Sequence, residues 1–158
     1  MSYLIDTNVL LRSRDADSPY QEVCRRAVDL LIETDETAYV CTQVLAEYWV
    51  VATRPCTVNG MGLSSEAAAA EIDRIMGAFD SLVEPADGAV RWRDVVVRHN
   101  VIGKPAHDAR LVALMLAHDL THLLTLNPGD FARYQDVTPV TPQEMIDLLS
   151  NETPTTRQ

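Results

Sequence analysis

The sequence lacks the features that would place the chain in or across a membrane. No apolar run approaches the roughly 20 residues that a helix needs to cross a bilayer. The N-terminus also lacks the basic start and long apolar stretch of a signal peptide. We therefore expect a cytoplasmic protein that makes no contact with a membrane.

Cysteine is scarce, with three widely spaced residues at Cys24, Cys41 and Cys56. An odd number at such spacing predicts neither a disulfide framework nor a paired metal site. We interpret the three as small hydrophobic residues that stay reduced in the cell.

Basic residues are few, because 13 Lys and Arg stand against 23 Asp and Glu, for a net charge of −10. Proteins that bind nucleic acid through its phosphates usually carry a basic surface. The composition therefore disfavours a tight nucleic-acid binder. It remains compatible with an enzyme that meets phosphates through metal ions, since cations reverse the local sign of charge, and with a protein that pairs with a basic partner.

Several well-known catalytic motifs are absent from the sequence. It contains no Walker loop, no His-Cys zinc spacing, no Gly-x-Ser-x-Gly elbow and no Gly-x-Gly-x-x-Gly fingerprint. The 158 residues are 47% hydrophobic, which is enough for one domain with a real core. We expect this domain to span residues 1–150 and the polar residues 151–158 to form a disordered tail.

Short apolar runs alternate with helical patterns along the chain. Strands are predicted in the run 3–11, with Asp6 at a strand end, and at 38–41, 82–83, 122–127 and 137–140. Helices are predicted at 18–34, 43–53, from Ser64 or Ser65 to about 79, and at 87–99, 106–117 and 141–149. This alternation predicts an α/β fold, with a central parallel sheet of about four to five short strands and helices on both faces.

Four acids fall where such a sheet would bring them together, at Asp6, Glu47, Asp108 and Asp130. Each lies at a strand end or in the first turns of a following element, and ligand sites of parallel sheets lie beyond the carboxyl ends of the strands. Each acid also has a simpler interpretation. Asp6 could cap a turn, Glu47 could be a partly exposed acid near a helix start, Asp108 could be an N-cap, and Asp130 could belong to an Asx turn.

Four converging carboxylates would repel one another, and a divalent cation would offset that repulsion. Oxygen ligands suit Mg²⁺ or Mn²⁺ better than Zn²⁺. A site of this kind serves the hydrolysis of phosphate esters. Arg91, Arg93 and Arg98 form the densest basic patch and are candidate phosphate contacts, although arginines on a helix more often form a solvated face.

Four segments together resemble the PIN-domain family: Asp6-Thr7-Asn8 after a strand, Ala46-Glu47, His107-Asp108-Ala109, and the stretch 124–131. The resemblance covers about residues 1–147 and is strongest to the toxin ribonucleases of VapBC-type toxin–antitoxin pairs. It implies a single PIN-like domain with metal-dependent endoribonuclease activity.

In that family the matching acids hold one or two Mg²⁺ or Mn²⁺ ions. The resemblance assigns this role to Asp6, Glu47, Asp108 and Asp130, and it assigns Asn8 and Thr125 to positions that orient the acids. It also implies RNA as the substrate, a cognate antitoxin as partner, and a homodimer. Two other functions use the same residues or surface: a metal-dependent phosphatase acting on small phosphate esters, and a binding module whose acidic surface engages a basic partner.

Overall fold

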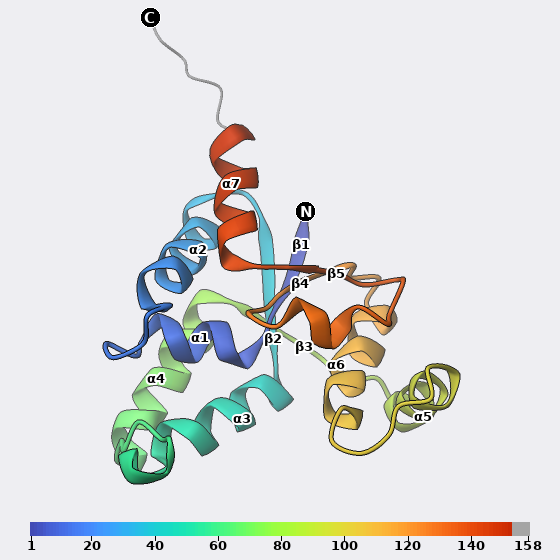
Figure 1. Cartoon of the computed structure of the whole chain (residues 1–158), viewed down its shortest axis with the longest axis horizontal. Coiled ribbons are helices and arrows are strands. Elements are labelled where there is room, and N and C mark those ends of the chain that lie inside the picture. Colours follow the sequence, from blue (N-terminus) through green and yellow to red (C-terminus); the bar gives the residue numbers. More distant parts are fainter. Residues whose placement is uncertain (153–158) are drawn as a thin grey trace, which may run out of the picture.

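A five-stranded parallel sheet forms the centre of the computed structural model, which describes residues 1–152 (Figure 1). Its strands are β1 (Ser2–Ile5), β2 (Thr37–Cys41), β3 (Asp80–Leu82), β4 (His122–Leu124) and β5 (Thr138–Val140). They lie in the order β3-β2-β1-β4-β5, and every neighbouring pair is parallel. The predicted α/β class is confirmed.

The helices lie in two groups on either side of the strands (Figure 1). They are α1 (Thr7–Ser13), α2 (Gln21–Glu33), α3 (Thr42–Thr53), α4 (Ser65–Ala78), α5 (Gly88–Arg98), α6 (Ala106–Ala117) and α7 (Pro142–Glu152). Two short 3₁₀ turns, η1 (Cys56–Val58) and η2 (Pro128–Phe131), complete the described part of the chain. Helix α1 packs on α2 and α3, and α2 also packs on α7, whereas α5 packs on α6.

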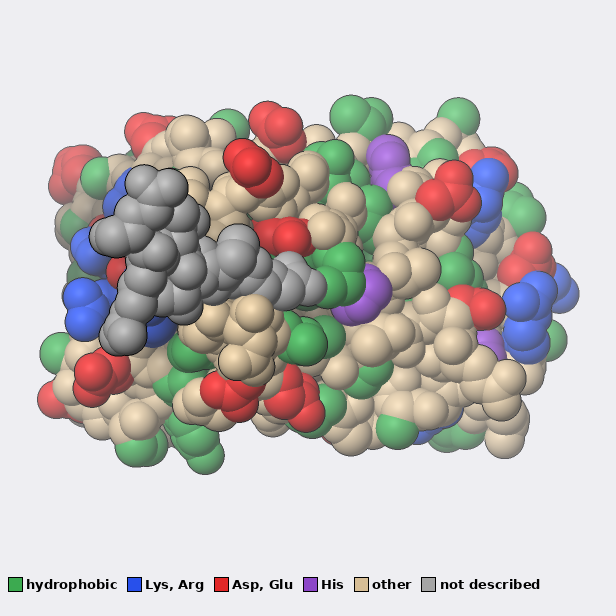
Figure 2. All heavy atoms as spheres, turned by 90° about the horizontal axis from the view of Figure 1, so that it is seen from above, with side chains coloured by type: hydrophobic (Ala, Val, Ile, Leu, Met, Phe, Trp, Pro, Cys, Tyr) green, Lys and Arg blue, Asp and Glu red, His purple; other side chains and the backbone are tan. Residues whose placement is uncertain are grey.

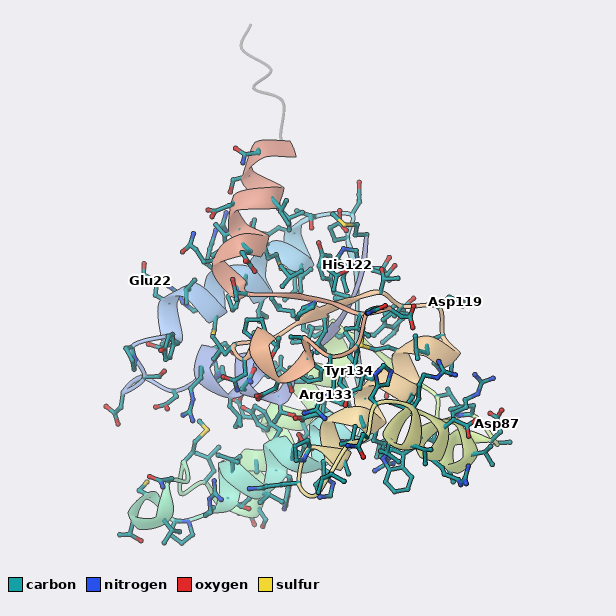
Figure 3. All side chains as sticks on the ribbon, turned by 45° about the vertical axis from the view of Figure 1, so that its right-hand side comes forward. Glu22, Asp87, Asp119, His122, Arg133 and Tyr134 are labelled. Atoms are coloured by element: carbon teal, nitrogen blue, oxygen red, sulfur yellow. The ribbon has the colours of Figure 1, made fainter. Side chains whose placement is uncertain are left out.

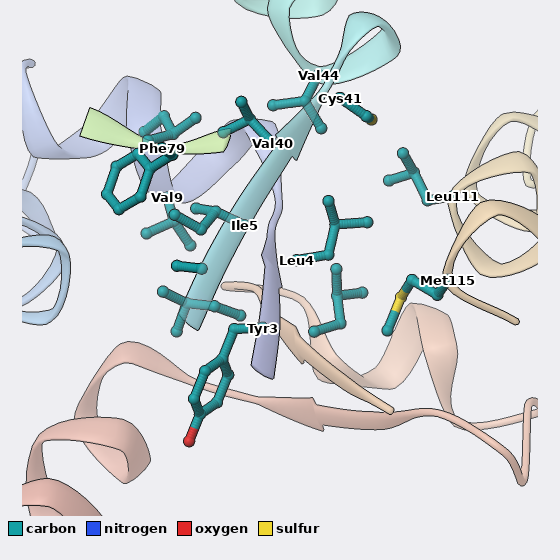
Figure 4. Close-up of a cluster of buried hydrophobic side chains, with 14 of the residues drawn as sticks. Tyr3, Leu4, Ile5, Val9, Val40, Cys41, Val44, Phe79, Leu111 and Met115 are labelled. Carbon is teal, nitrogen blue, oxygen red and sulfur yellow. The ribbon is translucent and has the colours of Figure 1, made fainter. Parts of the chain in front are cut away.

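The core is densest around β1, the central strand. Tyr3, Leu4 and Ile5 are each 0% exposed, because helices cover both faces of the sheet. Leu111 and Met115 of α6 approach the strands from one side and Val9 of α1 from the other (Figure 4). Strand β1 is buried on both faces, and the polar residue Asp6 follows directly where the strand ends. The candidate site lies at this end of the strand.

The chain leaves β1 sooner than the apolar run 3–11 predicts. Asp6 ends the strand, and its carboxylate accepts a hydrogen bond from the Thr7 amide at 2.8 Å, so that it caps α1. The apolar residues Val9, Leu10 and Leu11 are therefore helical, and all three are buried in the core. A run of this length fits a strand or a helix equally well, and the capping carboxylate decides between them.

Other helix and strand ends in the structure differ by a few residues from the predicted ones. The helix predicted from Ser18 begins at Gln21, because the Ser18 hydroxyl accepts from the Tyr20 amide in a turn instead of capping the helix. The strand predicted over 122–127 is shorter in the structure, where it ends at Leu124. The final helix continues past Leu149 to Glu152. Residues 153–158 of the predicted disordered tail lie outside the described residues.

Two predicted helix starts are confirmed. The Ser64 hydroxyl caps α4 by accepting from the Ala67 amide at 3.1 Å. At the start of α7, the Glu144 carboxylate accepts from the Thr141 amide, and the Thr141 hydroxyl accepts from the Glu144 amide. This reciprocal pair is a capping box.

Candidate active site

All four predicted acids line one hollow of about 390 Å³ at the carboxyl edge of the sheet. Asp6 follows β1, Glu47 lies in α3 after β2, Asp108 lies in the first turn of α6, and Asp130 lies in η2 after β4. Parallel strands end at the same edge, so residues that follow different strands meet there. The structure therefore brings together all four acids that the sequence predicts at this edge.

Asp6 is the most buried of the four acids, with 9% of its surface exposed. Its Oδ1 accepts from the Thr7 amide and its Oδ2 accepts from the Thr125 hydroxyl, both at 2.8 Å. Burial raises the pKa of Asp6 to about 6, and the nearby carboxylates of Asp108 and Glu47 add to the rise, while the two hydrogen bonds oppose it. The capping interpretation of Asp6 is correct, because its carboxylate caps α1, and the same residue lines the hollow.

Glu47 is held at both of its carboxylate oxygens. The Thr7 hydroxyl donates to Oε2 at 2.7 Å, and the Gln43 amide donates to Oε1 at 3.0 Å. The same Gln43 nitrogen donates to the His107 carbonyl at 2.9 Å, which ties α3 to the first turn of α6. Gln43 therefore links the element that carries Glu47 to the element that carries Asp108.

Thr7 and Gln43 had no predicted role in the site. Gln43 precedes Glu47 by four residues, the spacing that places two helical side chains on one face, so a signal was present. Its contact with the carbonyl of His107 spans 64 residues and has no local signature.

Asp108 is half-buried on the same edge. Burial raises its pKa, with further contributions from Asp130 and Glu47, and His107 acts in the opposite direction. Pro105 occupies the N-cap position of α6, and Asp108 is the third residue of the helix. The N-cap alternative for Asp108 is therefore wrong, and its carboxylate is available to the hollow.

Two predicted orienting residues lie beside the acids. Thr125 is 0% exposed and bonds Asp6, as described above. The Asn8 side-chain oxygen accepts from the Leu126 amide at 3.2 Å, which holds the segment that leads to η2 and Asp130. Asp130 itself is exposed at the mouth of the hollow.

No Lys or Arg forms an ion pair with any of the four acids in the described part of the chain. Within residues 1–152, no three His, Cys, Asp or Glu side chains stand close enough to share one ion. The carboxylates surround a common hollow without meeting at a common point. Their all-oxygen donor set and uncompensated charge fit Mg²⁺ or Mn²⁺, and a bound ion would require side-chain rotation.

A second hollow of about 560 Å³ adjoins the first and shares three of its acids, Glu47, Asp108 and Asp130. Its other side chains include Lys104, His107 and Arg133, so its lining is partly cationic. None of these three belongs to the site predicted from the sequence. His107 and Lys104 lie just before Asp108 in sequence, whereas Arg133 follows η2 (Figure 3).

The three arginines of the predicted basic patch lie on α5 and line neither hollow. Arg91 bonds Asp87 at 2.8 Å, and Arg93 lies 3.6 Å from Asp94. On this helix Val95 is buried, whereas Val90 is 60% exposed. That Arg91, Arg93 and Arg98 contact phosphate stays a prediction. Over the face shown in Figure 2, acidic side chains are scattered and do not form one patch.

A family model described as the PIN domain matches residues 3–137. The chain belongs to the PIN domain family. No curated protein sequence matched this PIN domain. None of the helices that the structure describes is long and apolar enough to cross a membrane.

Solved structures share the fold of this PIN domain at low sequence identity. VapBC2 from Rickettsia felis, bound to a DNA fragment from its promoter, is 16% identical with a TM-score of 0.65, over 89% of this chain and 98% of that chain. VapBC from Salmonella typhimurium, also bound to DNA, is 15% identical with a TM-score of 0.66, over 90% and 98%. VapC20 from Mycobacterium tuberculosis, a toxin that cleaves the sarcin-ricin loop, is 20% identical with a TM-score of 0.57, over 77% and 86%.

Proposed function

We propose that this PIN domain is a metal-dependent endoribonuclease that hydrolyses RNA phosphodiester bonds, and that it is the toxin of a toxin–antitoxin pair. The observation that carries the proposal is the convergence of Asp6, Glu47, Asp108 and Asp130 on one open hollow, with no basic side chain paired to them among the described residues. The structural likeness to an RNA-cleaving toxin from Mycobacterium tuberculosis supports the same reaction.

The four acids would hold Mg²⁺ or Mn²⁺. Such an ion, when bound, polarises the phosphoryl oxygen and stabilises the charge that develops during hydrolysis. Thr125 and the Thr7 amide fix the orientation of the Asp6 carboxylate. The Thr7 hydroxyl and Gln43 fix that of Glu47, while Asp130 at the exposed mouth is within reach of an incoming strand.

The partner in this proposal is a cognate antitoxin that covers the hollow, and the PIN domain itself forms a homodimer. Two structural neighbours are VapBC assemblies bound to DNA. Val50 lines the hollow and is 57% exposed, which offers apolar surface at its rim to a partner. The net charge of −10 favours a partner segment that is basic.

Removal of divalent metal tests the activity directly. The purified, partner-free protein is incubated with a mixed RNA pool in Mg²⁺ or Mn²⁺, with and without a chelator. We expect RNA fragments only when the metal is available. A folded protein that leaves RNA intact but hydrolyses a generic phosphomonoester would replace the proposal by the phosphatase alternative, and one that does neither would leave the binding-module alternative.

Gln43 provides a finer test of the acid arrangement. We expect Gln43→Met to weaken the apparent affinity for Mn²⁺ by about 10-fold to 100-fold, the usual cost of removing a group that orients a metal ligand. The reason is that Glu47 loses one of its two hydrogen-bond donors and α3 loses its link to α6. The measurement is RNA cleavage as a function of Mn²⁺ concentration, with Gln143→Met on α7 as the matched control. Equal Mn²⁺ dependence in parent and Gln43→Met would show that Gln43 does not position Glu47.

A further inference from the structure

The two hollows adjoin at the acid cluster, because both are lined by Glu47, Asp108 and Asp130. A strand that places one phosphodiester at these shared acids therefore lies next to both hollows. The two linings differ in chemistry, and this difference indicates which part of the strand each would receive. The inference that follows rests on the proposed RNA cleavage and names how the substrate lies in that site.

The larger hollow carries the cations. Lys104 precedes α6, and Arg133 follows η2, so two separate segments supply one positive group each. Both side chains are exposed, and neither forms an ion pair with a described acid. Their free donors suit the non-bridging oxygens of a phosphate, to which Arg can donate two parallel hydrogen bonds and Lys offers a compact charge.

The smaller hollow has an apolar lining. Besides the acids, it is lined by apolar residues and by three uncharged polar residues: Leu11, Val50, Val51, Phe131, Thr7, Asn8 and Asn127. It holds no Lys or Arg, so it offers a second phosphate no cationic partner against the repulsion of the carboxylates. An apolar surface beside side-chain amides instead suits a nucleobase, whose ring is apolar and whose edge makes hydrogen bonds.

We propose that a single RNA strand crosses the acid cluster with one nucleobase in the apolar hollow and the neighbouring phosphate on Lys104 and Arg133. A base can enter such a hollow only when it is unstacked and unpaired, so the preferred substrate is a single-stranded segment or loop. The proposal also explains how a chain with net charge −10 holds a polyanion: two local cations and the metal offset the negative charge of the acids where the strand lies.

The test compares RNA binding by three double variants with the same change in charge. An Asp108→Asn background keeps the RNA intact, and the probe is a fluorescent single-stranded RNA octamer titrated at several salt concentrations in Mg²⁺. We expect Lys104→Ala with Arg133→Ala to weaken binding by roughly 10-fold per residue at low salt. The slope of log affinity against log salt should become shallower by about 0.7 for each phosphate that is no longer neutralised by a cationic side chain.

The charge-matched control is Arg25→Ala with Arg26→Ala, on the exposed surface of α2. A third double variant, Arg93→Ala with Arg98→Ala, tests in the same assay whether the basic patch on α5 binds the RNA instead. An unchanged salt slope for the Lys104 and Arg133 variant, or an equal loss for the α5 variant, would overturn the proposal. Thermal unfolding of each variant shows whether it is folded, and because both cations are exposed we expect unchanged midpoints.

Cleavage of short substrates by the metal-loaded protein separates this inference from the proposed function. A dinucleotide has one phosphodiester and no neighbouring phosphate, whereas a trinucleotide has a second one. The Lys104 and Arg133 variant should therefore lose more cleavage relative to the parent on the trinucleotide than on the dinucleotide, mainly as a higher KM. A parent that cleaves no RNA would contradict the proposed function, while the binding assay would still decide how the strand lies.

Discussion

Asp6→Asn should stabilise the metal-free protein while abolishing RNA cleavage. In the folded state the pKa of Asp6 is raised from 3.8 to about 6, chiefly because the carboxyl is buried. A carboxyl whose pKa is higher in the folded state opposes folding once it is ionised. A difference of roughly two pKa units corresponds to about 3 kcal/mol, and loss of a charged acceptor for Thr7 and Thr125 reduces the expected gain to about 1–3 kcal/mol.

The pH dependence gives the sign of this effect. Below pH 3.8 both states hold the proton and Asp6 contributes nothing. As the pH rises from 3.8 to about 6, the unfolded chain releases its proton first, so the free energy of unfolding falls, and above about 6 the full penalty is present. The Asp6→Asn protein should lack this decline.

The measurement is chemical unfolding in chelator between pH 4 and 8, with the exposed Asp136→Asn as the control. Divalent metal should stabilise the parent more than Asp6→Asn, because the ion offsets the charge that the substitution removes. A less stable Asp6→Asn protein at pH 7 would show that the hydrogen bonds from Thr7 and Thr125 outweigh the cost of burying the charge.

Asp108→Asn should lower RNA cleavage by about 1,000-fold or more while leaving the fold intact. Charge stabilisation by a correctly held metal ion contributes several kcal/mol to catalysis, and each 1.36 kcal/mol is a factor of ten in rate. The amide is nearly the same size as the carboxyl but a weaker ligand. Because Asp108 is half-buried and does not cap α6, the substitution removes charge without removing a structural hydrogen bond.

Asp119→Asn is the matched control for this experiment. Asp119 lies just beyond the other end of α6, with a φ of 55° that Asn adopts readily, and it is exposed and away from both hollows. Single-turnover cleavage of one RNA by the parent, Asp108→Asn and Asp119→Asn measures the effect. Cleavage by Asp108→Asn at more than a tenth of the parental rate would remove Asp108 from the proposed site.

The position of each acid at the site follows from the local sequence pattern and from one rule of sheet topology. Asp6 and Asp130 follow apolar strands, and Asp108 opens an apolar helix. The strands are parallel, so their carboxyl ends meet at one edge. Each position can be identified from its own stretch of sequence, which is why the sequence alone predicts all four acids at this edge.

The conformation of 7–11 shows where local pattern fails. The residues are apolar enough for a strand, but the Asp6 carboxylate caps a helix at that point. The same carboxylate faces the hollow, so one side chain satisfies a local structural need and belongs to the candidate site. A pattern of hydrophobicity cannot distinguish these outcomes, because both bury the same residues.

The sequence by itself determined the α/β class, the parallel sheet, and the four acids at its carboxyl edge, because each depends on short segments and on a general rule of chain topology. Only the tertiary structure decided which polar groups hold those acids and which cations lie beside them. Gln43 reaches His107 across 64 residues, and Lys104 shares a hollow with Arg133 from a different segment, whereas the arginines on α5 line neither hollow. Such contacts depend on how helices pack around the sheet, which no single stretch of sequence encodes.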